Sequence, residues 1–351
     1  MHEQWQEFLT NVGAEFNHGN VIHYGNPRRE SSVVLTGNAF ADLSHFGLIS
    51  VHGEDAVSFL QAQFSNDLNT VDKHHSQLSG YCNPKGRLIA TLRIFQHADS
   101  YYLCLPTELV ETIIKRLRMF VLRAQVTLED VSDNFVHLGV TGNDIDAELG
   151  RVISSLPETV NDVTSTDETV KIKVPGAQSS YEIFTTVELA KTLWNALNVK
   201  AAPVGAGAWM LGDIQAGIPV IVSQTSEAFV PQMVNWNLVD GVSFKKGCYP
   251  GQEIVARMEY LGKLKRRMYK AQVASDQPPV AGDEVFDANG NTQPVGKLVS
   301  SANHPDGVYS LLVVLQISAA ESESSSLRLV DQSGPKIELE NLPYPFPVED
   351  K

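Results

Sequence analysis

The stretch "ISVHGEDA", at Ile49–Ala56, decides the fold, because the chain repeats its pattern as "LGVTGNDI" at Leu138–Ile145. Each copy has a short run of alternating residues, a glycine turn and an acidic residue that opens a helix. Asp55 and Asp144 stand where an N-cap or first-turn acid is favoured. The repeat therefore predicts two related units, each with a strand that leads through a glycine turn into a helix.

A second pair of similar segments supports the same two units. The segment "YYLCLPTELVETIIKRL" at Tyr101–Leu117 resembles "YEIFTTVELAKTLWNAL" at Tyr181–Leu197, and both read as a strand that runs directly into an amphipathic helix. In the first unit, "NPKG" at Asn83–Gly86 supplies the turn of a β-hairpin, and "QVTLED" at Gln125–Asp130 reads as a closing strand. Helices on one face of a largely antiparallel sheet predict an α+β fold.

The pattern changes after Lys263. The runs "MYKAQVA", "GDEVFDA", "PVGKLVSSA" and "YSLLVVLQIS" are short and strand-like, and turn residues rich in Pro and Gly separate them. This spacing predicts a small all-β barrel or sandwich. We expect one exposed loop at Glu321–Ser326 and an extended tail in the final "LPYPFPVEDK", where three prolines exclude a helix.

Composition and charge exclude several classes of protein. The net charge of the 351 residues is −14, which argues against a general nucleic-acid binder. No apolar run approaches the roughly 18 residues of a membrane span, and the polar N-terminus lacks the features of a secretory signal. The three cysteines, Cys82, Cys104 and Cys248, are scattered and form no metal-binding motif. We therefore expect a cytoplasmic protein with free thiols, no membrane segment and no metal site.

The segment "KKGCYPGQE" at Lys245–Glu253 holds the cysteine with the most unusual surroundings. A lysine pair precedes Cys248, and a helix is expected to begin near Pro250, so cationic neighbours and a helix N-terminus favour the thiolate. Gly247 and Gly251 would allow a close approach or a positive φ. The residues alone predict an exposed, reactive thiol, and a buried cysteine in a tight loop remains the alternative. No histidine lies close enough in sequence to serve as its base.

Basic residues gather in the same region. Between Lys245 and Lys270 there are eight basic residues and two acids, inside a strongly acidic chain. The cluster is a candidate anion site, and a solvated basic face is the alternative. Its basic members are Lys245, Lys246, Arg257, Lys263, Lys265, Arg266, Arg267 and Lys270.

The extended segment "FKKGCYPGQEIVARM" at Phe244–Met258 resembles the K-G-C-[YF]-x-G-Q-E signature of the YgfZ family. These proteins are relatives of the T-protein, the aminomethyltransferase of the glycine cleavage system. The resemblance continues through "FGLISVHGEDAVSFLQAQFSNDL", "CNPKGRLIATLRIF", "GDIQAGIPVI" and "FVPQMVNWNLVDGVSF" to "LPYPF" near the C-terminus. It covers nearly the whole chain.

The resemblance implies a GcvT-like ring of three domains, with two interlaced ferredoxin-like α+β units and a C-terminal β-barrel. On this reading, residues 1–262 form the folate-binding region. Its units are expected at about residues 48–130, and at 1–47 together with 131–262. The barrel is expected at residues 263–351.

The resemblance also implies a ligand, tetrahydrofolate or a derivative, bound in the centre of the ring. By position, Phe46 and Trp209 resemble the aromatic residues assigned to folate binding, and Gln215 matches a glutamate that contacts the pterin in T-proteins. Cys248 is the expected functional thiol, held as thiolate by Lys246 and the helix N-terminus. The other expected motif residues are Gly247, Tyr249, Gly251, Gln252, Glu253 and Arg257.

The chain departs from the enzyme branch at one informative place. T-proteins carry an acid pair where this chain has Ala90 and Thr91, so the carboxylate of aminomethyl transfer is missing and glycine cleavage is not expected. The resemblance implies instead an accessory protein for the assembly or repair of iron–sulfur enzymes. Its partners would be those enzymes, tRNA methylthiotransferases among them, or assembly factors, and tRNA modification would depend on it without direct RNA binding.

Two alternatives stay open. One is a folate-dependent one-carbon transferase that uses Cys248 in place of the missing acid. The other is a module that binds tRNA directly through the basic residues between Lys245 and Lys270, which the net charge of −14 disfavours.

Overall fold

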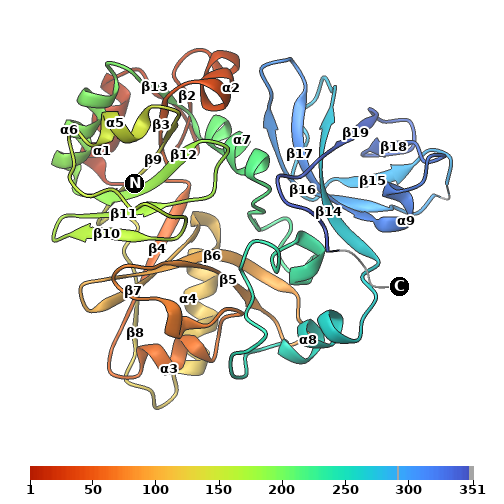
Figure 1. The fold of residues 1–351 in the computed structure, drawn as a ribbon, viewed down its shortest axis with the longest axis horizontal. Helices are drawn as coiled ribbons and strands as arrows, with labels where there is room; N and C mark the ends of the chain where they lie inside the picture. The colour runs from red at the N-terminus through yellow and green to blue at the C-terminus, as the bar shows by residue number, and fades with distance from the viewer. Residues whose placement is uncertain (291, 348–351) are drawn as a thin grey trace.

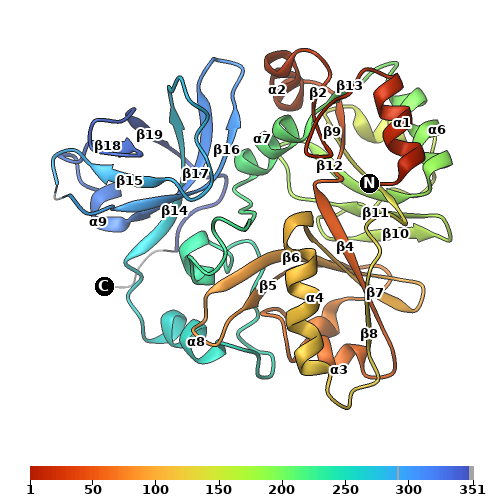
Figure 2. The same cartoon turned by 180° about the vertical axis from the view of Figure 1, so that it is seen from behind.

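The computed structural model describes residues 1–290 and 292–347. Three large β-sheets, each with its own helices or loops, lie around a common centre (Figure 1), and the view from behind shows the same arrangement (Figure 2). Within the described ranges, no helix combines the length and the apolar character that crossing a membrane requires.

A five-stranded antiparallel sheet forms the first unit. Helices α3 (Ala56–Gln61) and α4 (Thr107–Val121) cover one of its faces through a continuous apolar cluster. The predicted hairpin, closing strand and strand-to-helix connections are confirmed here. In spatial order the strands are β5 (Gln77–Cys82), β6 (Leu88–His97), β7 (Ser100–Pro106), β4 (Phe46–His52) and β8 (Thr127–Asp130).

A six-stranded sheet forms the second unit. Three helices, α1 (Glu3–Asn11), α5 (Ile145–Leu149) and α6 (Val187–Leu197), pack on one face around the buried Trp194. Its strands are antiparallel except at the edge pair β3–β13. In spatial order they are β10 (Val163–Thr166), β11 (Thr169–Lys173), β12 (Ser179–Thr185), β9 (Val136–Gly142), β3 (Ala39–Asp42) and β13 (Ala202–Val204).

The two units are interlaced, as the family resemblance implies. Strand β3 pairs with β9 in the six-stranded sheet, whereas β4, which follows after only three residues, pairs with β7 and β8 in the five-stranded sheet. The chain therefore passes from one unit into the other at residues 43–45 and returns after β8. The faces not covered by helices turn toward each other, and residues of both sheets share one apolar cluster, which includes Leu48 and Phe184.

The C-terminal sheet is antiparallel and curled into a half-barrel. Its edge strands approach each other through a bridge between Arg328 and Lys336, which explains the predicted barrel character. Helix α9 (Ile317–Ala320) follows β17. In spatial order the strands are β18 (Leu327–Leu329), β15 (Glu284–Asp287), β16 (Gly296–Asn303), β17 (Tyr309–Gln316), β14 (Arg266–Val273) and β19 (Ile337–Glu340).

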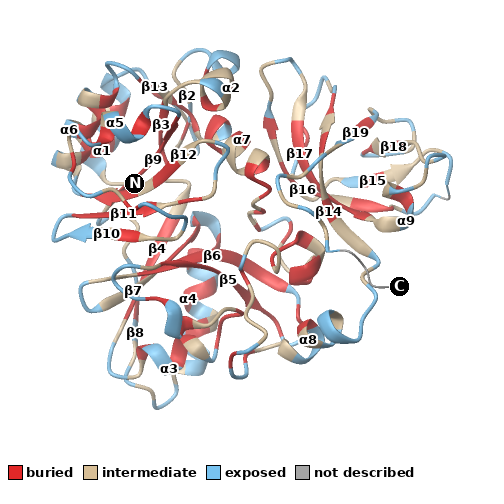
Figure 3. Ribbon diagram, viewed as in Figure 1, coloured by how far each residue is buried: buried red, intermediate tan, exposed pale blue. Residues whose placement is uncertain are grey.

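Helix α7 (Ala206–Ala216) lies between the six-stranded sheet and the C-terminal sheet (Figure 1). Buried residues extend along α7 and along the facing strands of both α+β units (Figure 3). The centre of the molecule is therefore well shielded from solvent. The remaining elements are β1 (Glu15–Asn17), β2 (Asn20–His23), α2 (Pro27–Thr36), η1 (Leu68–Thr70), η2 (Pro231–Val234) and α8 (Gln252–Tyr260).

The structure also bears on the predicted loop at residues 321–326 and on the predicted extended tail. Residues 321–326 lie in a loop between α9 and β18, as expected. The tail is without helix or strand as far as residue 347, and its last four residues lie outside the described part of the chain.

Candidate functional site

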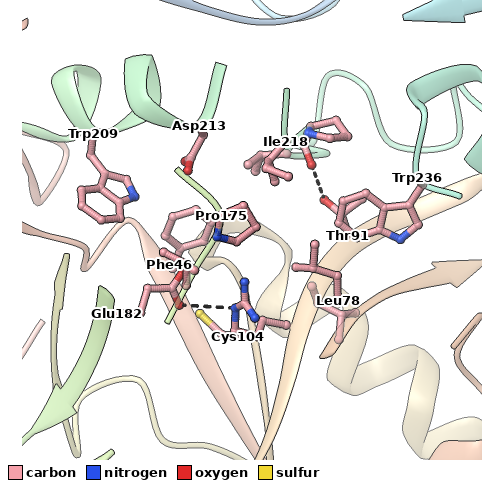
Figure 4. Close-up of a pocket in the computed structure, with 15 residues that line it drawn as sticks. Phe46, Leu78, Thr91, Cys104, Pro175, Glu182, Trp209, Asp213, Ile218 and Trp236 are labelled. Carbon is pink, nitrogen blue, oxygen red and sulfur yellow. Dashed lines mark hydrogen bonds and ion pairs between the residues drawn. The ribbon is translucent and has the colours of Figure 1, made fainter. Parts of the chain in front are cut away.

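A pocket opens between the two α+β units, beneath α7. Phe46 at the start of β4 and Trp209 of α7 both line it, so the structure brings together the two aromatic residues expected from the sequence. Figure 4 shows Trp209 and Asp213 projecting from α7 on one side, with Glu182 and Cys104 on the other. Flat apolar walls with a few convergent polar groups are typical of small-molecule sites.

A glycine on strand β9 makes room for the ring of Trp209, which projects from helix α7. The indole is only 5% exposed. A Cβ added at Gly139 of β9 would lie 2.6 Å from the nearest ring atom. Gly139 therefore allows the ring to lie directly on the strand, and any larger residue would push it out of its position.

Two carboxyl groups, of Asp213 and Glu182, and the guanidinium group of Arg93 line the pocket. Asp213 lies one helical turn after Trp209 and therefore on the same face of α7. Burial raises the pKa of Asp213 to about 8, and the negative charge of Glu182 adds to the rise, while Arg93 opposes it. Burial alone would raise the pKa of Glu182 as well, but the contact with His137 and the charge of Arg93 lower it. The pocket is thus lined by one carboxyl group that is neutral near pH 7 and one that is ionised.

The positions of the missing acid pair have different surroundings. Ala90 is fully buried in the core of the five-stranded sheet, whereas Thr91 lines the pocket. The Thr91 hydroxyl donates to the Pro219 carbonyl at 3.3 Å and accepts from the Ile221 amide at 3.0 Å. Thr91 therefore fastens the loop after α7 to the five-stranded sheet.

Gln215 lies outside the lining of this pocket. Its side-chain oxygen accepts a hydrogen bond from Lys270 Nζ at 2.9 Å, and its nitrogen donates to Ser310 Oγ at 3.4 Å. Both partners belong to the C-terminal sheet, so Gln215 joins α7 to that sheet. Together with Trp209 and Asp213 it also borders a neighbouring pocket.

The cysteine loop is anchored by a buried lysine. The ammonium group of Lys246, 8% exposed, donates to the main-chain carbonyls of Gln61 and Phe64, and it lies 5.2 Å from the centre of the Tyr249 ring. Burial lowers the pKa of Lys246 to about 8, although the charge of Asp67 opposes this shift. The ammonium group thus points into the protein and fixes the loop, a different role from the expected one of holding the thiolate.

Cys248 is exposed, as the sequence predicts, and lies three residues before Gly251, the N-cap of α8. Gly251 has a φ of 79°, and a Cβ on it would lie 2.4 Å from the carbonyl oxygen of Asn83. The loop is therefore pressed against the hairpin turn between β5 and β6. Gln252 donates to the Lys246 carbonyl at 3.5 Å, which closes the loop on itself.

The other members of the motif differ in exposure. Tyr249 is buried, whereas Gly247, Glu253 and Arg257 are exposed. Cys248 does not border the pocket that Phe46 and Trp209 line.

The basic cluster does not form one uniform surface. Lys246 is buried, Lys270 binds Gln215 and lies 3.6 Å from Glu340, and the Arg267 guanidinium lies 4.6 Å from the centre of the Phe346 ring. Several members thus serve internal contacts, which leaves less charge for an external anion than the sequence suggests.

Several residues that line or support the pocket were absent from the sequence-based prediction. Asp213 could have been found from its helical spacing to Trp209, because both lie on one face of α7. Glu182 could have been found from strand alternation, since Tyr181 and Ile183 face the opposite side of the sheet. Gly139 carried no local signal, because its partner is Trp209, far along the chain.

The fold and the pocket together define a class: an α+β protein with a pocket between two interlaced units and a curled β-sheet beside it. Residues 15–239 match the family described as the GCVT N-terminal domain. This match spans more than half of the chain, and the protein belongs to that family.

The relatives are similar over most of their length. The chain is 29% identical over 310 residues to the tRNA-modifying protein YgfZ of Colwellia psychrerythraea (strain 34H / ATCC BAA-681), covering 88% of this chain and 94% of the relative. It is also 29% identical over 324 residues to the protein of that name from Serratia proteamaculans (strain 568), covering 92% of this chain and 97% of the relative.

Among solved structures, the glycine cleavage system aminomethyltransferase T of Bartonella henselae has the same fold. The TM-score is 0.80 at 17% sequence identity, and the match covers 96% of both chains. At this identity the likeness establishes the fold alone.

Proposed function

We propose that this protein binds tetrahydrofolate or a derivative between Phe46 and Trp209, and that it acts as an accessory factor in tRNA modification. The observation that carries the proposal is the pocket itself, with aromatic walls and a neutral carboxyl group on the same helix face as Trp209. A flat pterin would pack against the aromatic rings. The similarity to YgfZ proteins, whose name describes them as tRNA-modifying, supports the second part.

Asp213 is the residue we assign to the pterin edge. The lactam edge of a pterin presents an N–H donor beside a carbonyl acceptor. A neutral carboxyl group presents the matching acceptor and donor, and its raised pKa of about 8 keeps Asp213 in this form near neutral pH. An asparagine side chain offers the same pair of groups.

This assignment predicts a distinctive pH dependence. Tetrahydrofolate binding by the wild-type protein should weaken as the pH rises through about 8, because Asp213 then loses the proton that it donates. Asp213→Asn should bind equally well at neutral pH and keep its affinity above pH 8. Asp213→Leu should bind about tenfold more weakly or worse. Calorimetric titration of the three proteins measures these affinities.

The control is Asp276→Asn, which changes an exposed acid on the C-terminal sheet side of the molecule. Its affinity should follow the wild type at every pH. An unchanged affinity in Asp213→Leu would contradict the assignment, and no detectable binding by the wild type would contradict the folate proposal.

For the accessory role, we propose the cytoplasm as the compartment, iron–sulfur enzymes that modify tRNA as the clients, and Cys248 as the working thiol. All three cysteines are free, as expected in a reducing compartment, and Cys248 is the exposed one. The clamped loop holds it at the surface, where a partner protein can reach it.

In cells that lack this protein, Cys248→Ser should fail to restore tRNA methylthiolation, although the purified variant still folds and binds tetrahydrofolate. Mass spectrometry of tRNA nucleosides measures the modification. Cys82→Ser, at a buried thiol, is the control and should restore it. Full restoration by Cys248→Ser would contradict the role of the thiol and leave the folate site unaffected.

One observation favours the alternative of a folate-dependent one-carbon transferase. Asp213 has a pKa near the operating pH, which suits a general acid or base. Turnover of 5,10-methylene-tetrahydrofolate by the purified protein, lost in Asp213→Asn with binding intact, would establish this activity. We rank it second because neither Ala90 nor Thr91 supplies the carboxylate of aminomethyl transfer.

A further inference from the structure

Three side chains that could bind a metal ion meet at the floor of the pocket. A sulfur atom of Cys104, one nitrogen of His137 and a carboxylate oxygen of Glu182 all lie within 4.8 Å of one another. Cys104 and Glu182 also line the pocket, where Figure 4 shows them close together. The three residues are far apart in the sequence, so no spacing motif announces them.

Strand register explains why they meet. In the six-stranded sheet His137 of β9 is paired with Phe184 of β12, so Glu182, two residues from Phe184, lies diagonally across from His137 on the same face. In the five-stranded sheet Cys104 of β7 is paired with Arg93 of β6. Because these two faces turn toward each other, the thiol of one sheet meets the imidazole and carboxylate of the other.

Two polar atoms of this cluster make ion-pair contacts but no hydrogen bond in the described part of the chain. His137 is 7% exposed, and its Nε2 lies 3.5 Å from Glu182 Oε2. Among the residues that the structure describes, neither of these two buried atoms has a hydrogen-bond partner. Buried polar atoms are nearly always hydrogen-bonded, so two buried atoms that make only these longer ion-pair contacts call for an explanation.

We propose that Cys104, His137 and Glu182 bind one divalent transition-metal ion of the zinc class. A thiolate, an imidazole and a carboxylate are the ligand types that Zn²⁺ uses, and ligands of mixed softness suit it and Co²⁺ better than Mg²⁺ or Ca²⁺. A metal ion between them would give both atoms, which lack a hydrogen bond, a direct partner. Three protein ligands leave a coordination position open, as in zinc sites that bind a further ligand.

The charges around the site are compatible with this ion. The Cys104 thiol would lose its proton to solvent when the metal binds, because the thiolate is the form that ligates a metal ion. The thiolate and the carboxylate then neutralise the two charges of the ion.

Arg93 is a cation beside the site, and it has other partners. Its Nε lies 3.9 Å from Glu182 Oε2, while its terminal nitrogen donates to Ser76 Oγ at 3.1 Å and to Asn161 Oδ1 at 2.8 Å. These polar partners would still bind the guanidinium group of Arg93 if the Glu182 carboxylate bound a metal ion. The proposal does not depend on a folate in the pocket above.

Titration of the full-length protein with Co²⁺ tests the site, because a cobalt–thiolate bond gives an intense charge-transfer absorption. The wild type should bind one ion with this absorption. The double variant Cys82→Ser/Cys248→Ser, in which Cys104 is the remaining thiol, should give the same band. Cys104→Ser should lose the band, and His137→Gln, which removes a direct ligand, should weaken binding by at least the roughly 10–100-fold that loss of an outer-shell partner costs.

The double variant keeps the test decisive even if Cys104→Ser, at a buried position, fails to fold. A band that is absent in the wild type or in the double variant would overturn the proposal. So would a band that persists unchanged in a folded Cys104→Ser protein. Zinc should also raise the melting temperature of the double variant, and tetrahydrofolate affinity, measured separately, reports on the folate proposal alone.

Discussion

Replacing Trp209 with alanine should lower the free energy of unfolding by about 3–5 kcal/mol and abolish tetrahydrofolate binding. The side chain is 5% exposed and packs among residues of both sheets, so its removal leaves a cavity at their junction. The same ring forms a wall of the pocket, which would lose the flat surface that we assign to the pterin. Urea unfolding and calorimetric titration measure the two effects.

A matched pair of milder variants separates packing from binding. Trp209→Phe and Trp194→Phe each replace a buried indole with a smaller ring, but Trp194 lies in the core on the opposite, helix-covered face of the six-stranded sheet. Both should lose some stability, whereas only Trp209→Phe should weaken tetrahydrofolate binding. Equal affinities in the two variants would show that the indole of Trp209 is not part of the ligand site.

Local sequence patterns predicted most of the secondary structure, because each depends on neighbours in the chain. Asp55 and Asp144 are the N-caps of α3 and α5, as the repeat predicts, although neither side chain caps its helix by a hydrogen bond. Asp55 accepts instead from the amide of Gln125, at the far end of the unit. The position of a helix start is thus a local property, while the partner of the side chain depends on the tertiary fold.

The interlacing of the units could not be read from periodicity. Strand β3 and strand β4 are separated by three residues, yet they belong to different sheets, and β3 also pairs with the distant β13. Such pairings are fixed by which faces must be buried, and a single strand does not encode its neighbours. Only the resemblance to a known family supplied this part of the architecture.

The candidate site was likewise only partly predictable from the sequence. The resemblance named Phe46 and Trp209, and the structure places both in one pocket. It could not show that Gln215 turns to Lys270, or that the ammonium group of Lys246 turns inward, because both contacts depend on side-chain direction in the folded protein. Glu182 reaches the pocket through strand register, which no motif describes.

Replacing Gly251 with alanine should lower the free energy of unfolding by about 3 kcal/mol, because two costs add. The residue has a φ of 79°, which a residue with a side chain adopts only with strain. The new Cβ would also lie 2.4 Å from the carbonyl oxygen of Asn83 and 2.5 Å from Cα of Gly86, and main-chain atoms of a tight turn have little room to move. Urea unfolding measures the loss.

Gly247→Ala is the control within the same loop, because no heavy atom lies within 4 Å of the Cβ that it adds. We expect it to retain wild-type stability and wild-type reactivity of Cys248 toward a thiol reagent, whereas Gly251→Ala should change both. Equal behaviour of the two variants would show that the loop is not clamped against the hairpin.

If Gly251→Ala folds but fails in cells as Cys248→Ser does, while still binding tetrahydrofolate, then the conformation of the loop matters to the function as much as the thiol. The proposed folate pocket and the cysteine loop would then be two separate functional sites. Lys246 and the β5–β6 hairpin would link the loop to the unit that borders the pocket.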